Sequence, residues 1–241
     1  MELIGFHDTR AYVSSLSVVG RRFVLVGDLY RGVQLVVWRE DDHSLTQIAK
    51  EYEPSGETHC AEFVVDEPGL GLTPSTLPPA PQMLQFSMTA PEARGGNRLL
   101  CQSDFHLGAR VGRLTRLRTF GGRNRRGGAR YCLLAATLDG GLGSACPVEE
   151  RVFRRLYALQ GIMCNALPHS AAANPRSFRL FDTGPASQVE RRKNVLDGTL
   201  LWRFVCLDGA TQRDLTRAIG TTVDAVMGNL LDIDLACSLF L

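Results

Sequence analysis

The spacing of apolar residues changes near Pro147, and this change constrains the fold more than any other feature of the chain. Before that residue, short β-branched runs such as GVQLVVWRE and THCAEFVVD recur at intervals of roughly ten residues with turn residues between them, as is typical of antiparallel strands. After it, apolar residues recur every three or four positions, which indicates helices. The sequence therefore predicts a β-rich domain over residues 1–146 and a helical domain over residues 147–241.

The β-rich region contains about a dozen strand-like runs, or about three groups of four. The first run is expected at residues 3–10, and the last two form a hairpin around Asp139, Gly140 and Gly141. A propeller blade consists of four strands in roughly 40–45 residues, so the count fits three blades of an incomplete β-propeller. It also fits part of a sandwich or a barrel.

Two segments of this region are not predicted to be strands. Residues 68–81 contain five prolines, which disfavour a central strand and a helix, so a surface loop is expected there. Residues 120–130, FGGRNRRGGAR, consist almost entirely of glycine, arginine and other polar residues, which predicts an exposed loop.

The helical region begins at Pro147, which suits a first helical turn because it lacks a backbone N–H. Apolar residues at helical spacing then mark one face, namely Val148, Val152, Leu156, Leu159 and Met163. Pro168 is expected to end this helix. Asp197 is expected to cap a second helix, whose inward residues would be Leu200, Leu201, Phe204 and Leu207.

Two capping boxes predict the last two helices, one from Thr211 to Asp214 and one from Thr221 to Asp224. The final helix carries an apolar stripe of Val223, Val226, Met227, Leu230 and Leu231. The pair resembles a helix-turn-helix, but no Lys or Arg follows Arg217. A helix that enters a DNA groove needs positive charge, so DNA recognition is disfavoured.

No arrangement of reactive side chains in the sequence predicts catalysis or a cofactor. The seven cysteines include no CxxC pair, so neither a zinc ribbon nor a dithiol redox site is expected, and we expect reduced thiols. Cys164 and His169 lie five residues apart without an identifiable Asn or Asp to orient a nucleophile pair. Neither a GxxxxGK[ST] phosphate loop nor an apolar run of membrane length occurs. We expect an intracellular, non-catalytic protein with no cofactor, metal, membrane or small-molecule substrate.

One basic segment is a candidate contact for RNA or for an acidic protein surface. Its arginines are Arg110, Arg113, Arg116, Arg118, Arg123, Arg125, Arg126 and Arg130. Arginine pairs with phosphate through its guanidinium fork and stacks on bases, so a salt-sensitive RNA contact is physically reasonable. The alternative is a solvated basic loop without a ligand.

Five segments together carry a family resemblance: LLCQSDFHLGARVGRL, AATLDGGLGSACPVEERVFRRLYALQ, LPHSAAANPRSFRLF, NVLDGTLLWRF and IGTTVDAVMGNLLDID. In this order they resemble the C-terminal end of the large subunit family of the cleavage and polyadenylation specificity factor. That family belongs to a superfamily with damaged-DNA-binding protein 1 and the propeller subunit of splicing factor 3b. The motif positions are Asp104, Phe105 and His106 at a corner, Asp139, Gly140 and Gly141 at a turn, and Asp197 and Gly198 at a helix start.

The resemblance implies a scaffold. Members of the family build three β-propellers and a C-terminal helical domain, and they hold the WD-repeat and zinc-finger subunits that read the polyadenylation signal in precursor mRNA. Residues 1–146 would then be the last blades of the final propeller. Because the chain matches only the end of the family pattern, we expect a fragment or one piece of a split subunit.

The resulting hypothesis is a non-catalytic scaffold subunit in nuclear pre-mRNA 3′-end cleavage and polyadenylation, with an auxiliary RNA contact. One alternative is a related propeller scaffold of splicing or ubiquitin-ligase complexes. A second is a direct RNA-binding module that uses the segment from Arg110 to Arg130.

Overall fold

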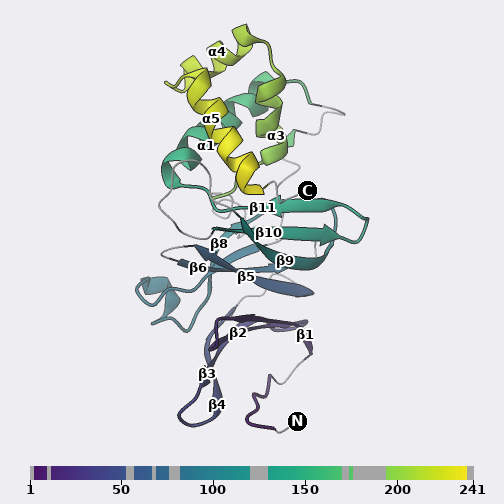
Figure 1. Ribbon diagram of the computed structural model, residues 1–241, viewed down its shortest axis with the longest axis vertical. Helices are drawn as coiled ribbons and strands as arrows, with labels where there is room; N and C mark the ends of the chain where they lie inside the picture. Colours follow the sequence, from purple (N-terminus) through teal and green to yellow (C-terminus); the bar gives the residue numbers. More distant parts are fainter. Residues whose placement is uncertain are drawn as a thin grey trace. The chain divides into compact units, whose positions relative to one another are not determined.

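A computed structural model describes residues 3–9, 12–52, 57–66, 69–75, 82–119, 130–169, 174–175 and 194–237 (Figure 1). Contacts divide the chain into two compact units, each described here by itself. The first comprises residues 1–116, 133–144 and 181–193, and the second comprises residues 117–132, 145–180 and 194–241. Strands occupy the first part of the sequence and helices the last part, as the periodicity predicts.

The first sheet is an antiparallel meander in the order β1-β2-β3-β4. Its strands are β1 (Val13–Val19), β2 (Phe23–Asp28), β3 (Gly32–Arg39) and β4 (Ser44–Lys50). The turn between β2 and β3 is tight because Asp28 Oδ1 accepts hydrogen bonds from the N–H groups of Tyr30 and Arg31 at 2.9 and 3.0 Å. These four strands match the predicted runs closely.

The strand predicted at residues 3–10 is wrong. Residues 3–9 form no strand in the structure, and the side chains of Leu3 and Phe6 are 82% and 78% exposed. The segment instead passes close to the β3–β4 turn, since a Cβ on Gly5 would lie 2.7 Å from the carbonyl oxygen of His43. Alternating apolar residues favour a strand only where a neighbouring strand supplies hydrogen-bond partners.

The second sheet corrects the prediction for residues 68–81. Its order is β5-β6-β7-β8, with β5 (Cys60–Asp66), β6 (Gly69–Ser75), β7 (Gln82–Gln85) and β8 (Leu100–Asp104), so β6 is a central strand rather than a loop. Pro74 lies opposite Ala61 in the pairing of β6 with β5, whereas the pairing of β6 with β7 is confined to Gly71 and Leu72. The proline therefore interrupts no pairing between β6 and β7. Residues 76–81 lie outside the described residues.

The third sheet has three strands in the order β11-β10-β9. These are β9 (Val111–Thr119), β10 (Arg130–Thr137) and β11 (Leu142–Ala145), and β10 and β11 form the predicted hairpin. A 3-10 turn, η1 (Pro91–Ala93), precedes β8, and residues 97–99 hydrogen-bond to Lys50 at the end of β4. The predicted Gly/Arg loop at 120–130 lies outside the described residues except for Arg130.

The core of the first unit is built from the first two sheets. Its fully buried residues include Leu25, Val33 and Leu35 from the first sheet and Phe63 and Leu84 from the second. Phe63 is 0% exposed, and a buried aromatic ring of this size contributes a large share of core stability. Apolar packing therefore holds these two sheets against each other.

The helices of the second unit surround one apolar cluster. They are α1 (Glu150–Ala166), α3 (Gly198–Trp202), η3 (Arg203–Cys206), α4 (Gly209–Ala218) and α5 (Val223–Cys237). The cluster's buried residues are Leu156, Leu159, Met163, Cys164, Leu167, Leu200, Leu201, Phe204, Leu215, Val226 and Leu230. Of the predicted inward face of α1, Leu156, Leu159 and Met163 are buried and Val152 is partly buried. The inward leucines of α3 are confirmed. The segment NPRSFRLF (174–181), in which Pro175 would suit the first turn of a short helix, lies almost wholly outside the described residues.

Four local predictions for the helices are wrong. The first helix, α1, begins at Glu150 and not at Pro147, so Val148 lies before it. Asp208, not Thr211, caps α4, since its carboxylate accepts from the N–H groups of Ala210 and Thr211. Thr222, not Thr221, caps α5, because its hydroxyl accepts a hydrogen bond from Ala225 N–H at 3.3 Å. Aspartate is as good an N-cap as threonine, so the capping box alone does not select the first residue. Leu231 is 47% exposed and does not belong to the inward stripe.

Among the described residues, none of the helices has the length and the apolar character that crossing a membrane requires.

Candidate functional site

The first four arginines of the basic segment lie directly before β9 and along it. Arg110 is exposed just before this strand, Arg113 and Arg118 are exposed on it, and Arg116 is partly buried. Two exposed arginines thus lie on β9, and a third lies directly before it. Arg123, Arg125 and Arg126 lie outside the described residues, and the side chain of Arg130 is not described either.

The motif residues at 104–106 lie where β8 ends. Asp104 is the last residue of β8, and Phe105 and His106 follow it with partly buried side chains. The segment leads toward Val111, which is fully buried in a small cluster with Cys60, Leu114 and Ala135. This position agrees with the predicted corner between two strands.

Asp139 organises the β10–β11 turn. Its carboxylate accepts hydrogen bonds from the Thr137 hydroxyl and, at 3.3 Å, from Gly141 N–H. The hydrogen bond from Thr137, followed by the one from Gly141, lowers the pKa of the Asp139 carboxyl below its usual value. Gly140 has φ of +89°, a conformation that favours glycine. These contacts make the motif a turn-forming element.

Asp197 and Gly198 begin α3. The buried Asp197 carboxylate accepts from the N–H groups of Thr199 and Leu200 at 3.0 and 3.3 Å. Its own N–H donates to Gln160 Oε1 of α1 at 2.7 Å, so the cap also joins two helices. These three hydrogen bonds hold the start of α3 in place, so the role of Asp197 is structural.

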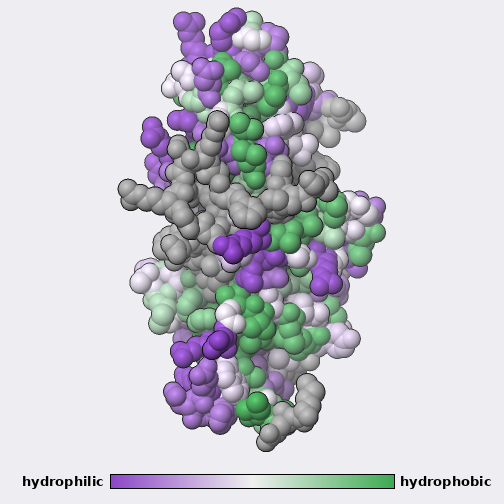
Figure 2. Space-filling view, in the orientation of Figure 1, coloured by the Kyte–Doolittle hydropathy of each residue, from purple (hydrophilic) through white to green (hydrophobic). Residues whose placement is uncertain are grey.

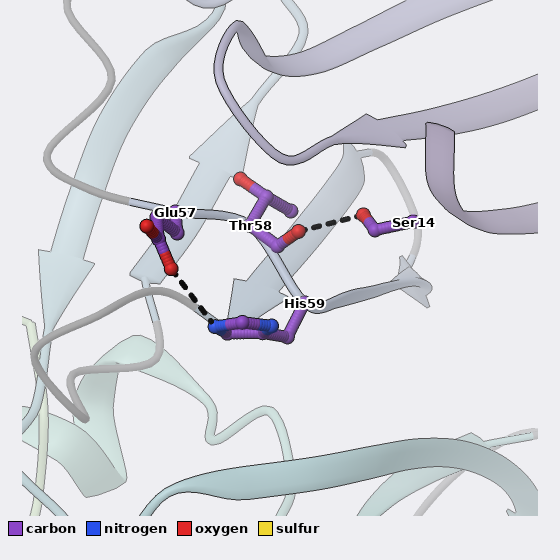
Figure 3. Close-up of polar contacts among 4 residues, drawn as sticks. All are labelled: Ser14, Glu57, Thr58 and His59. Carbon is purple, nitrogen blue, oxygen red and sulfur yellow. Dashed lines mark hydrogen bonds and ion pairs between the residues drawn. The ribbon is translucent and has the colours of Figure 1, made fainter. Parts of the chain in front are cut away.

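A network of polar groups joins β1 to the segment before β5 (Figure 3). The Ser14 hydroxyl donates to the carbonyl oxygen of Thr58 at 2.6 Å, and His59 Nε2 lies 3.6 Å from Glu57 Oε2. The Thr58 side chain is 0% exposed, and its hydroxyl has no hydrogen-bond partner among the described residues. The network fastens the first sheet to the second through polar as well as apolar contacts.

A polar pocket of about 420 Å³ opens beside the first sheet. It is lined by Asp8, Thr9, Tyr30, Arg31, Gln34, Gln47, Lys50, Glu51 and Tyr52. Lys50 Nζ lies 4.7 Å from the centroid of the Tyr52 ring, a cation–π distance. The lining contains two acidic and two basic residues and therefore does not select a ligand of one charge.

Hydrophobic residues also reach the surface around the first sheet (Figure 2). Leu16 and Val18 of β1 are 67% and 57% exposed, and β1 is the edge strand of its sheet. An edge strand with exposed apolar side chains is a common docking surface for another chain.

Cys164 lies near the end of α1 and His169 follows this helix; the sequence does not predict that they form a nucleophile pair. His169 Nε2 lies 2.8 Å from the backbone carbonyl oxygen of Cys164. This hydrogen bond joins the His169 ring to the backbone of α1 and does not involve the Cys164 thiol. Within the described ranges, no group of three His, Cys, Asp or Glu side chains is arranged to hold a metal ion.

Comparison with known proteins decides the family. Residues 1–206 match the family model described as the CPSF A subunit region. The chain belongs to this family. It is 33% identical over 239 residues to a probable cleavage and polyadenylation specificity factor subunit 1 of Oryza sativa subsp. japonica, in an alignment that covers 98% of this chain and 16% of the relative.

Two further relatives agree with this assignment. Cleavage and polyadenylation specificity factor subunit 1 of Arabidopsis thaliana is 32% identical over 94% of this chain, and that of Drosophila melanogaster is 28% identical over 99% of it. The alignments cover 16% and 17% of these relatives, so the chain spans about one sixth of their length. The resemblance inferred from the sequence motifs is thus confirmed.

Sequence reasoning missed one cluster in this CPSF A family member. Cys132, Cys146 and Cys237 come together although the first and the last are 105 positions apart in the sequence. Their spacing carries no motif, so only the folded chain could reveal the cluster.

Proposed function

We propose that this chain acts as a non-catalytic scaffold segment in pre-mRNA 3′-end cleavage and polyadenylation, in the nucleus. The observation that supports this most is the family match, which covers residues 1–206 and is accompanied by relatives aligned over nearly the whole chain. Those relatives are named as subunits of the cleavage and polyadenylation specificity factor. Within such a complex, a subunit without a catalytic constellation contributes binding surfaces.

In this proposal the three sheets are blades of a β-propeller. Two sheets of four consecutive strands and one of three strands support that architecture, since blades are antiparallel four-stranded meanders. Residues 1–146 would form the partial propeller and residues 147–241 the helical domain. The proposed partners are the WD-repeat and zinc-finger subunits of the polyadenylation factor.

Affinity capture of the tagged chain from nuclear extract tests the scaffold function. Polyadenylation-factor subunits are expected in the eluate. Spliceosomal or cullin partners in their place would overturn the proposal in favour of a related scaffold. The double variant Leu16→Ser and Val18→Ser should weaken capture if β1 is a docking edge, while Leu142→Ser, at a 73% exposed position on β11, serves as the matched control.

A direct RNA contact is the second candidate, and the exposed Arg110, Arg113 and Arg118 support it. Charge reversal at Arg113 and Arg118 should weaken binding to single-stranded RNA. It should also reduce the slope of log K against log salt by about 0.7 for each phosphate that the variant no longer neutralises. Reversal of the exposed Arg213 and Arg217 of α4 is the control. Equal binding by all three proteins would rule out this contact.

A further inference from the structure

Three thiols from distant parts of the sequence meet within the second unit. Cys132 lies on β10, Cys146 lies between β11 and α1, and Cys237 is the last residue of α5. Cys237 Sγ donates a hydrogen bond to Cys146 Sγ at 3.3 Å. Cys237 also shares a hydrogen bond with Cys132, so its sulfur contacts both other thiols.

The three thiols differ in burial. Cys132 is 1% exposed, whereas Cys146 and Cys237 are partly exposed. The hydrogen bond with Cys237, followed by burial, raises the pKa of the Cys132 thiol far above its usual value. Because the thiolate is the nucleophile in disulfide chemistry, the raised pKa and the burial of Cys132 make it a poor nucleophile.

We propose that Cys146 and Cys237 are a site of reversible oxidation, at which a low-molecular-weight disulfide converts the two thiols into an intramolecular disulfide. The sulfur atoms are already in contact, and they need to approach by only roughly 1.2 Å to reach the ~2.05 Å of an S–S bond. Cys132 remains a thiol beside them.

The reaction consists of two consecutive thiol–disulfide exchange steps. The Cys146 sulfur, which accepts the S–H···S hydrogen bond, loses its proton to solvent and attacks the small disulfide, releasing one small thiol and leaving a mixed disulfide on Cys146. Cys237 then loses its proton and attacks the Cys146 sulfur, releasing the second small thiol. The two cysteines are oxidised together, and the small disulfide is reduced to two thiols.

The bond would close a loop that contains the helices described in the second unit. The cysteines are 91 positions apart, and the segment between them includes α1, α3, α4 and nearly all of α5. A cross-link over so long a loop restricts the unfolded chain strongly. It would also fasten the end of α5, whose Val226 and Leu230 belong to the helical core. In a reducing compartment such a bond would form only transiently, as regulatory disulfides do.

The test exposes the full-length chain to oxidised glutathione, blocks the remaining thiols with an alkylating agent, and maps the peptides by mass spectrometry without reduction. A peptide pair linked through Cys146 and Cys237 is expected, and dithiothreitol should remove it. The oxidised chain should melt roughly 5–15 °C higher than the reduced chain, as a long-loop cross-link predicts.

Matched variants separate this bond from general thiol oxidation. Cys146→Ser and Cys237→Ser should each abolish the linked peptide and the shift in Tm, whereas Cys206→Ser, at an exposed position on η3, should retain both. A linked peptide through Cys132, or glutathione adducts without any intramolecular link, would overturn the assignment. The peptide map of the unmodified sequence decides the question even if a variant fails to fold.

Discussion

Thr58, just before β5, and Thr216, in α4, are both buried threonines, with 0% and 2% of their surface exposed. The Thr216 hydroxyl donates to the carbonyl oxygens of Gln212 and Arg213 at 2.9 and 3.1 Å. The Thr58 hydroxyl has no partner among the described residues. The same side chain is therefore satisfied in the helical part of the chain and unsatisfied in the β-rich part.

The difference has a general physical cause. A helix places a backbone carbonyl one turn before each residue, so a buried hydroxyl can bond within its own helix. A residue beside a strand depends on whatever another segment presents. Ser15 and Asp28 of the first sheet also have buried oxygen atoms without partners among the described residues, whereas the buried Asp197 of the helical part caps α3. Asn229 of α5 is the helical exception.

The largest expected effect comes from removing one core ring in each part. Phe63→Ala and Phe204→Ala each remove a side chain that is 0% exposed and should each lower the free energy of unfolding by about 3–5 kcal/mol. Hydrogen exchange measured by mass spectrometry should then increase mainly in β1–β8 for Phe63→Ala. It should increase mainly in α1 and α3–α5 for Phe204→Ala.

Leu231→Ala is the control for these substitutions. Leu231 is 47% exposed, so its truncation should cost less than about 1 kcal/mol. If either core variant speeds exchange equally in strands and helices, the two parts unfold as one cooperative unit, and the comparison between them fails.

An intermediate effect of opposite sign is expected for the two threonines. Thr216→Val removes the hydroxyl, whose single proton is shared between the carbonyl oxygens of Gln212 and Arg213, and should destabilise the chain by about 1 kcal/mol. Thr58→Val removes a hydroxyl that has no partner among the described residues and should stabilise it by about 1 kcal/mol. Urea denaturation of both variants measures the difference. Destabilisation by Thr58→Val would show that an ordered water satisfies this hydroxyl.

The smallest effect concerns acid pH and the cap of α4. The hydrogen bond from the Thr211 hydroxyl, followed by that from Thr211 N–H, lowers the pKa of the Asp208 carboxyl below 3.8. A lowered folded-state pKa stabilises the fold above the unfolded-state pKa, and this contribution is lost as the pH falls through the folded-state value.

Asp208→Asn keeps a capping side chain but does not titrate. The urea midpoint should therefore fall less between about pH 6 and about pH 3 in the variant than in the parent chain. Equal falls would show that the Asp208 cap does not contribute to acid sensitivity.

The sequence predicted the type of most elements correctly and some of their ends incorrectly. The runs that became β1–β4 and the inward face of α1 follow from apolar spacing, which reflects burial directly. Cap positions at Asp208 and Thr222 were missed by a few residues, because several neighbouring side chains could cap each helix. The exposure of Leu231 was missed because the spacing of apolar residues shows which face of a helix is buried but not how wide that face is.

The basic segment stays a predicted contact, and the structure shows where its described arginines and the motif residues lie. Arg113 and Arg118 are exposed, as a contact surface requires, and Asp139 and Asp197 occupy a turn and a helix start. The pocket beside Tyr52 and the thiol cluster were not predicted, since their members carry no pattern in the linear sequence.

The sequence by itself determined where strands give way to helices, which residues start the turn at Asp139 and the helix at Asp197, and the family. These features depend on residues only a few positions apart, so local spacing and capping chemistry suffice. Only the tertiary structure decided that β6 forms a central strand despite its proline, that residues 3–9 find no strand partner, and that Cys146 meets Cys237. Each of these outcomes depends on which distant segment lies alongside, and local spacing carries no information about that.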